Sequence, residues 1–89
     1  MVTFVFSQWA EKRFKKLHVV QQSRIVSKLK QLKTHPDIIS VLKPLHNFAP
    51  ATHRLRVGDY RVILQLSHES FSTIKLIILD VGHRRDVYE

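Results

Sequence analysis

Residues 53–65 read HRLRVGDYRVILQ, two alternating runs separated by a Gly-Asp pair at positions 58–59. Glycine at the first central position is typical of a two-residue type II′ turn, so we predict a β-hairpin. Such a turn fixes the register and places Arg56 opposite Arg61. Alternation divides the side chains between two faces. The apolar face carries Leu55, Val57, Tyr60, Val62, Leu64 and Leu66, and the other face carries Arg54, Arg56, Arg61, Ile63 and Gln65.

The arginine face is hard to explain by stability alone. Like charges directly opposite each other destabilise a strand pair by roughly 0.2–1 kcal/mol. An anion between Arg56 and Arg61 would remove this repulsion, and a guanidinium group matches phosphate oxygens bidentately. A carboxylate of the chain or of a partner can also pair with an exposed arginine. Three arginines on one hairpin face favour a phosphodiester as the ligand.

Length and composition indicate one small domain, residues 1–89, with 44% hydrophobic residues. Lys and Arg number 15 against 7 Asp and Glu, and the net charge of +8 predicts a polyanionic partner, either nucleic acid or an acidic protein. The chain has no cysteine, which excludes disulfides, thiolate nucleophiles and cysteine-ligated zinc. No apolar run approaches the roughly 20 residues of a membrane span. We therefore expect a cytoplasmic protein with no metal, no cofactor and no membrane partner.

The N-terminal half alternates at first and then becomes helical. Residues 1–6 predict a strand, and Ser7 can cap a helix that buries Ala10, Phe14 and Leu17. A second helix is predicted from about Val20 to Thr34, where His-Pro at 35–36 ends it.

Cations cover the outer faces of these two helices, with only Glu11 as a counter-charge. This pattern favours an electrostatic surface for a polyanion over an ordinary solvated face, which would mix both signs more evenly. The basic residues are Lys12, Arg13, Lys15, Lys16, Arg24, Lys28, Lys30 and Lys33, of which we assign Lys12, Arg13 and Lys28 to RNA binding.

The remaining segments complete a small α+β fold. Residues 37–52 form a connection packed on the core, residues 67–72 a polar turn, and Thr73 to Val81 a buried strand. The tail, residues 82–89, ends beside the sheet. The order β-α-α-β-β-β predicts a small antiparallel sheet with an N-terminal strand and a helical hairpin on one face, which leaves the arginine face open.

Two motifs resemble the RelE/ParE superfamily of bacterial and archaeal toxins. They are RLRVGDYRVI at residues 54–63 and VGHRRDVY at residues 81–88, and the resemblance covers nearly the whole chain. It implies a RelE-like mRNA interferase of a type II toxin–antitoxin system, which cuts messenger RNA in the ribosomal A site and is neutralised by a cognate antitoxin. The family's basic site residues match Arg54, Arg56, Arg61 and Arg84, and its C-terminal tyrosine matches Tyr88.

The sequence also departs from the family in ways that affect the assignment. Some members have lysines at the positions of Arg54 and Arg56, and others place a Glu and a His in the site, for which no matching Glu is evident. The ParE branch shares the fold, inhibits DNA gyrase and lacks the ribonuclease site. A gyrase inhibitor of this kind and a passive basic nucleic-acid-binding module therefore remain the alternatives to an endoribonuclease.

Metal-independent RNA cleavage requires a base for the 2′-hydroxyl, positive charge at the phosphate and an acid for the departing 5′-oxygen. We predict that Arg61 and Arg84 bind the reacting phosphate and that Arg54, Arg56 and Arg85 hold flanking phosphates. His83 and His53 are candidate bases because an imidazole group suits proton transfer near neutral pH. Alternatively, His83 could only hydrogen-bond the turn, and alternation places His53 in the core-facing set. Tyr88 could stack on a base, orient the 2′-hydroxyl, act as acid, or simply close the sheet edge. We expect an acidic antitoxin to cover the arginines.

Overall fold

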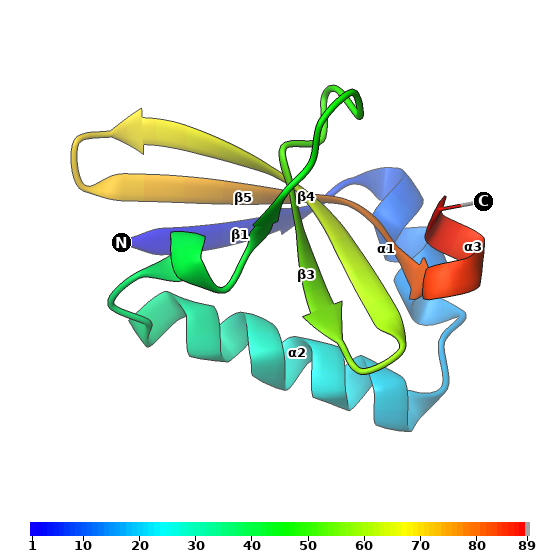
Figure 1. Ribbon diagram of the computed structural model, residues 1–89. Helices are drawn as coiled ribbons and strands as arrows, with labels where there is room; N and C mark the ends of the chain where they lie inside the picture. Colours follow the sequence, from blue (N-terminus) through cyan, green and yellow to red (C-terminus); the bar gives the residue numbers. More distant parts are fainter. Residues whose placement is uncertain (89) are drawn as a thin grey trace.

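The computed structural model describes the backbone from Met1 to Tyr88 and the side chains from Met1 to Val87. One mixed sheet is crossed on one face by a long helix (Figure 1). The elements in chain order are β1 (Val2–Phe6), α1 (Gln8–Lys15), α2 (Val19–Thr34), the 3-10 helix η1 (Ile38–Ser40), β2 (Lys43–Pro44), β3 (His53–Val57), β4 (Tyr60–Ser70), β5 (Thr73–His83) and α3 (Arg84–Tyr88). The strands lie in the order β1-β5-β4-β3-β2.

The core forms between α2 and one face of the sheet, as the apolar patterns predict. Ile25, Leu29 and Leu32 of α2 are buried against the apolar face of the hairpin and of β5. Ala10 of α1 is fully buried in the same cluster. Ser7 caps α1 as expected, since its Oγ accepts a hydrogen bond from the Ala10 N–H at 3.1 Å. The predicted α+β class is confirmed.

One strand pair differs from the predicted antiparallel sheet. β1 lies parallel to β5, with Phe4 opposite Leu76. A parallel pair needs a long crossover, and the two helices with the strands that follow them provide it. Because β4 occupies the opposite side of β5, this strand is paired on both edges for much of its length. Its burial alternates, with Leu76 and Ile78 buried and Ile77 and Leu79 only partly buried, so the predicted strand is central but only one of its faces is fully covered.

Two strand ends and one additional strand also differ from the sequence predictions. β4 continues to Ser70, so the polar residues predicted to form the turn belong largely to a strand. β5 continues past Val81 to His83, and the tail folds as α3. The connection before the hairpin contributes a two-residue strand, β2, that pairs with β3. No helix in the described part of the chain is long and apolar enough to cross a membrane.

Candidate functional site

The hairpin has the predicted turn and register. Gly58, at the first central position of the turn, has a φ of +61°, which glycine adopts without strain. Arg56 lies directly opposite Arg61 across β3 and β4. β2 adds Lys43 opposite Arg54, so two like-charge pairs meet at one corner of the sheet.

These four cations line one pocket of about 230 Å³, which we call the arginine pocket. The other described lining residues come from η1 and the segment that follows it, and no described lining side chain is acidic. The described lining consists of Ser40, Val41, Leu42, Lys43, Arg54, Arg56 and Arg61. Anionic ligands fit this lining because every charged group in it is positive.

Arg61 is buried in this pocket, which the expectation of an open arginine face did not anticipate. It is 7% exposed, and its Nη1 donates hydrogen bonds to the carbonyl oxygens of Gly58 at 2.8 Å and Tyr60 at 3.0 Å. Its Nε has no hydrogen-bond partner within the described residues. A buried cation held only by neutral carbonyls is incompletely compensated, because burial removes water from the charge.

His83 lies on the other face of the sheet from Arg61. His83 pairs with Tyr60, and Gly82, the residue before His83, pairs with Arg61. Paired residues share a face and successive residues alternate, so His83 and Arg61 lie on opposite faces. The His83 ring packs edge-on against Tyr60 with ring centroids 5.5 Å apart, and its Nδ1 accepts a hydrogen bond from the Arg85 N–H at 3.2 Å. The structure therefore separates this predicted base from the arginine pocket, and its Nδ1 instead accepts a hydrogen bond from the backbone at the start of α3.

The tail lies against the hairpin through α3. The Arg84 N–H donates a hydrogen bond to the Asp59 carbonyl oxygen at 2.8 Å, which ties the helix to the hairpin turn. A Cβ added at Gly82 would lie 3.3 Å from Cγ2 of Val87, so α3 packs closely on Gly82, the residue that pairs with Arg61. Arg84 and Arg85 are exposed. The side chain of Tyr88 lies outside the described residues.

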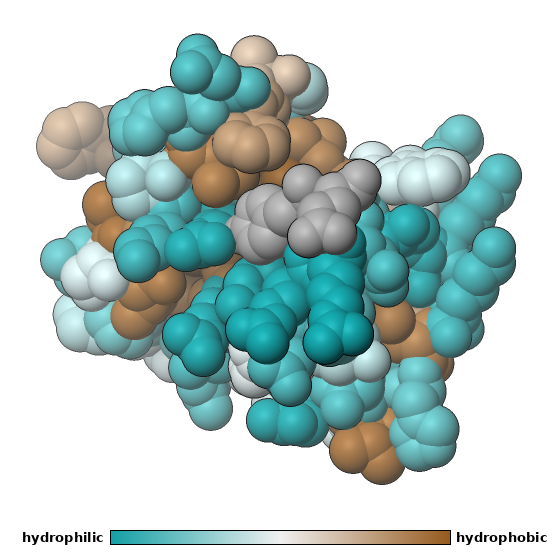
Figure 2. All heavy atoms as spheres, turned by 45° about the vertical axis from the view of Figure 1, so that its right-hand side comes forward, coloured by the Kyte–Doolittle hydropathy of each residue, from teal (hydrophilic) through white to brown (hydrophobic). Residues whose placement is uncertain are grey.

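The helix cations assigned to RNA binding differ in their surroundings. Arg13 forms an ion pair with Asp80 at 3.2 Å, donates to the Val81 carbonyl oxygen at 3.4 Å and lies 5.7 Å from the centre of the Trp9 ring. These contacts fasten α1 along β5 and leave Arg13 less available to a ligand. Lys12 is exposed, and Lys28 lines a separate groove beside the hairpin. On the face shown in Figure 2, hydrophilic side chains cover most of the surface, with an apolar patch near the top of the view.

Two cations near the site carry no clear signal in the sequence. Lys43 sits in a connection without a regular period, and only its pairing with β3 brings it to Arg54. Arg24 was one of many helix cations, and only the packing of α2 brings it to the hairpin turn. Among the residues described, no three His, Asp or Glu side chains gather as a metal site.

His53, at the start of β3, gives the fold a pH dependence. Burial lowers its pKa below the ordinary value, and its Nδ1 lies 2.9 Å from the Thr52 hydroxyl. Since the unfolded chain binds this proton more readily, the contribution of His53 to stability is lost as the pH falls below about 6.5.

We therefore expect a His53→Gln variant to lose less stability than the parent between about pH 7.5 and pH 5. Urea unfolding across this range measures the difference, and the five other histidines are common to both proteins. Identical pH profiles would show that His53 is not the group responsible.

Comparisons with known proteins support the fold assignment. No family model and no curated protein matches the sequence. The RelBE2 toxin–antitoxin complex of Mycobacterium tuberculosis contains a similar chain, with a TM-score of 0.70 and 28% identity over 93% of this chain and 88% of that one. A chain of the RelB-RelE antitoxin–toxin complex of Methanococcus jannaschii gives a TM-score of 0.66 at 20% identity over 94% of both. The isolated Escherichia coli RelE toxin gives 0.62 at 23% identity over 91% of this chain and 82% of the toxin.

The fold and the pocket thus define a small α+β protein with a cation-lined corner on its sheet. Its fold is like that of the RelE toxins, and the predicted resemblance is confirmed at the level of the fold.

Proposed function

We propose that this protein is the toxin of a type II toxin–antitoxin system and that it cuts messenger RNA on the ribosome. The observation that carries the proposal is Arg61, a buried guanidinium in a pocket whose described lining holds three further cations and no carboxylate. A phosphodiester bound in this pocket supplies negative charge beside the guanidinium. The toxins among the similar structures support the toxin part of this proposal.

The proposed reaction is attack of the 2′-hydroxyl oxygen on the adjacent phosphorus. The bond from phosphorus to the 5′-oxygen breaks, leaving a 2′,3′-cyclic phosphate on one product and a 5′-hydroxyl on the other. Negative charge builds on the non-bridging oxygens, where Arg61 and Arg56 stabilise it. Arg54 and Lys43 hold the neighbouring backbone. No metal is required, because the side chains supply the positive charge.

Proton transfer needs groups other than these cations. Arginine has a pKa above about 12 and is a poor base. His83 faces away from Arg61, so we assign the proton transfers to Tyr88 and to groups of the ribosomal RNA or of the substrate. This division of labour favours a toxin that works only when the ribosome completes its site.

The proposed protein partner is an acidic antitoxin. A domain with a net charge of +8 and an arginine pocket attracts carboxylates, and a disordered acidic segment that folds on binding can cover it. The antitoxin complexes among the similar structures support such a partner. We propose a cytoplasmic location, where ribosomes and messenger RNA are available.

Mapping of messenger RNA 5′ ends in a bacterium that produces the protein tests this function. We expect new 5′-hydroxyl ends within translated regions, and their loss when translation initiation is blocked. Ends that persist without translation would indicate a ribosome-independent nuclease. Growth arrest without new ends, accompanied by inhibited gyrase, would instead indicate a ParE-like activity.

A further inference from the structure

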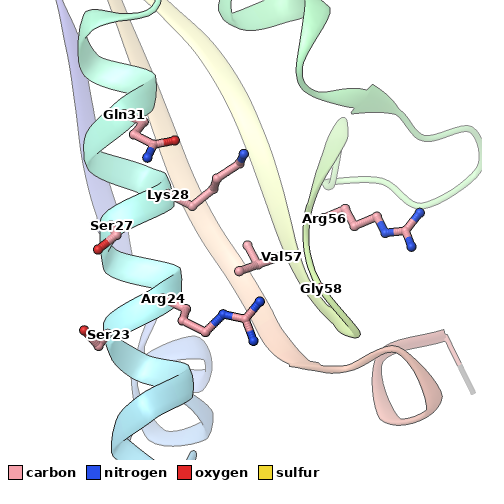
Figure 3. Close-up of a pocket in the computed structure, with 8 residues that line it drawn as sticks. All are labelled: Ser23, Arg24, Ser27, Lys28, Gln31, Arg56, Val57 and Gly58. Atoms are coloured by element: carbon pink, nitrogen blue, oxygen red, sulfur yellow. The ribbon is translucent and has the colours of Figure 1, made fainter.

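A second group of cations lies between α2 and the turn that joins β3 to β4 (Figure 3). The space is about 360 Å³, and we call it the α2 groove. α2 contributes no acidic residue to it. The groove is lined by Ser23, Arg24, Ser27, Lys28, Gln31, Arg56, Val57 and Gly58.

Arg24 and Lys28 are the cations that α2 directs at the hairpin. They stand four residues apart on the helix, and both side chains point toward the hairpin (Figure 3). A Cβ added at Gly58 would lie only 3.3 Å from Nη2 of Arg24, so the missing side chain of Gly58 makes room for the guanidinium. No described carboxylate forms an ion pair with either cation. Like charges at this spacing repel each other, and an anion between them would remove the repulsion.

The α2 groove and the arginine pocket meet at an open strand edge. Within the described residues, β2 pairs with His53 and Arg54 only, and the rest of β3 has no neighbouring strand on that side. Arg56 lies on this open part and lines both spaces, and its side chain points away from α2 (Figure 3). An extended polyanion that passes around the edge of β3 therefore meets cations in the groove, at the edge and in the pocket.

We propose that the α2 groove is a second phosphate site, which holds a backbone phosphate of the same RNA strand that places its scissile phosphate in the arginine pocket. This inference rests on the proposed function. The lining favours RNA over an acidic peptide, because its one apolar side chain, Val57, is itself buried. Peptide grooves depend on aromatic or apolar anchors, whereas backbone phosphates need only charge and hydrogen-bond donors.

The test compares two double variants of α2 with equal loss of charge. Arg24→Gln with Lys28→Gln empties the groove of its helix cations, and Lys30→Gln with Lys33→Gln removes two exposed cations that do not line it. The ligand is a short single-stranded RNA with 2′-O-methyl groups, which lacks the attacking hydroxyl. Binding is measured by fluorescence anisotropy over a series of salt concentrations.

We expect the groove variant to lower the slope of log affinity against log salt by about 0.7, the value for one lost phosphate contact on a single strand, and to weaken binding about tenfold. The control variant should keep the parent slope. Inorganic phosphate is also titrated into each protein while amide chemical shifts are recorded. The signals of residues 23–28 and 56–58 should move in the parent and stay in place in the groove variant.

Equal losses in the two variants would overturn the proposal. So would normal RNA binding by a groove variant that no longer binds the antitoxin, because the ligand of the groove would then be protein. If the parent cuts messenger RNA and the groove variant matches it in affinity and slope, this inference fails and the proposed function stands. If the parent neither binds nor cuts RNA, both fail.

Discussion

Replacing Arg61 with alanine is expected to lower messenger RNA cleavage on the ribosome by about 100-fold or more. Removal of one preorganised charge contact at a reacting oxygen commonly has an effect of this size. Arg61 meets the geometric requirement for preorganisation, because two hydrogen bonds from its Nη1 to backbone carbonyl oxygens fix the guanidinium in the pocket. Single-turnover cleavage on purified ribosomes measures the change.

The substitution should also destabilise the fold, since the side chain is buried and bonds the turn. Loss of a hydrogen bond to a charged group costs about 1.5–3 kcal/mol, so catalysis must be separated from unfolding. Arg61→Lys retains the charge, and Arg56→Ala removes an exposed cation from the same pocket without emptying buried volume. Circular dichroism melts of all three variants show what fraction is folded during the assay. An alanine variant that is folded and cuts at the parent rate would refute the role of Arg61.

Removal of α3 is expected to abolish cleavage while the antitoxin still binds. The variant ends at His83, because Gly82 and His83 are the last residues of β5 although the sequence placed them in the tail. It loses Arg84, Arg85 and Tyr88, and with them the proposed phosphate contacts and the proposed proton-transfer group of the tail. The core is untouched, and the partial exposure of Val87 limits the loss of stability to about 1 kcal/mol.

Two further variants show which tail group is responsible. Arg84→Ala should slow cleavage through the loss of charge at the phosphate. Tyr88→Phe keeps an aromatic ring and removes the hydroxyl, so it should cut normally if Tyr88 only stacks on a base and poorly if Tyr88 transfers a proton. Toeprinting of cut messenger RNA and antitoxin binding are the measurements. A variant ending at His83 that cuts like the parent would confine the site to the hairpin, and an unfolded one would make α3 part of the core.

Local patterns predicted the hairpin well, because each depends on residues close together in the chain. Gly-Asp at positions 58–59 determined the turn, the turn determined the register, and alternation then placed Arg54, Arg56 and Arg61 on one face. The apolar stripes of α1 and α2 and the cap at Ser7 were likewise predictable, since a helix repeats every few residues. The separation of His83 from Arg61 also followed from alternation, once β5 is known to continue to residue 83.

The other features of the candidate site depend on contacts between distant segments. Lys43 reaches Arg54 only through a two-residue strand in a connection without a period, and α3 forms on the hairpin from a tail too short to be a stable helix alone. By itself the sequence therefore determined which side chains share the arginine face. Only the tertiary structure decided that Arg61 is buried, that its guanidinium bonds the turn and that β1 lies parallel to β5. Burial and strand order are set by whichever segments pack together, and a local periodicity cannot specify its distant neighbours.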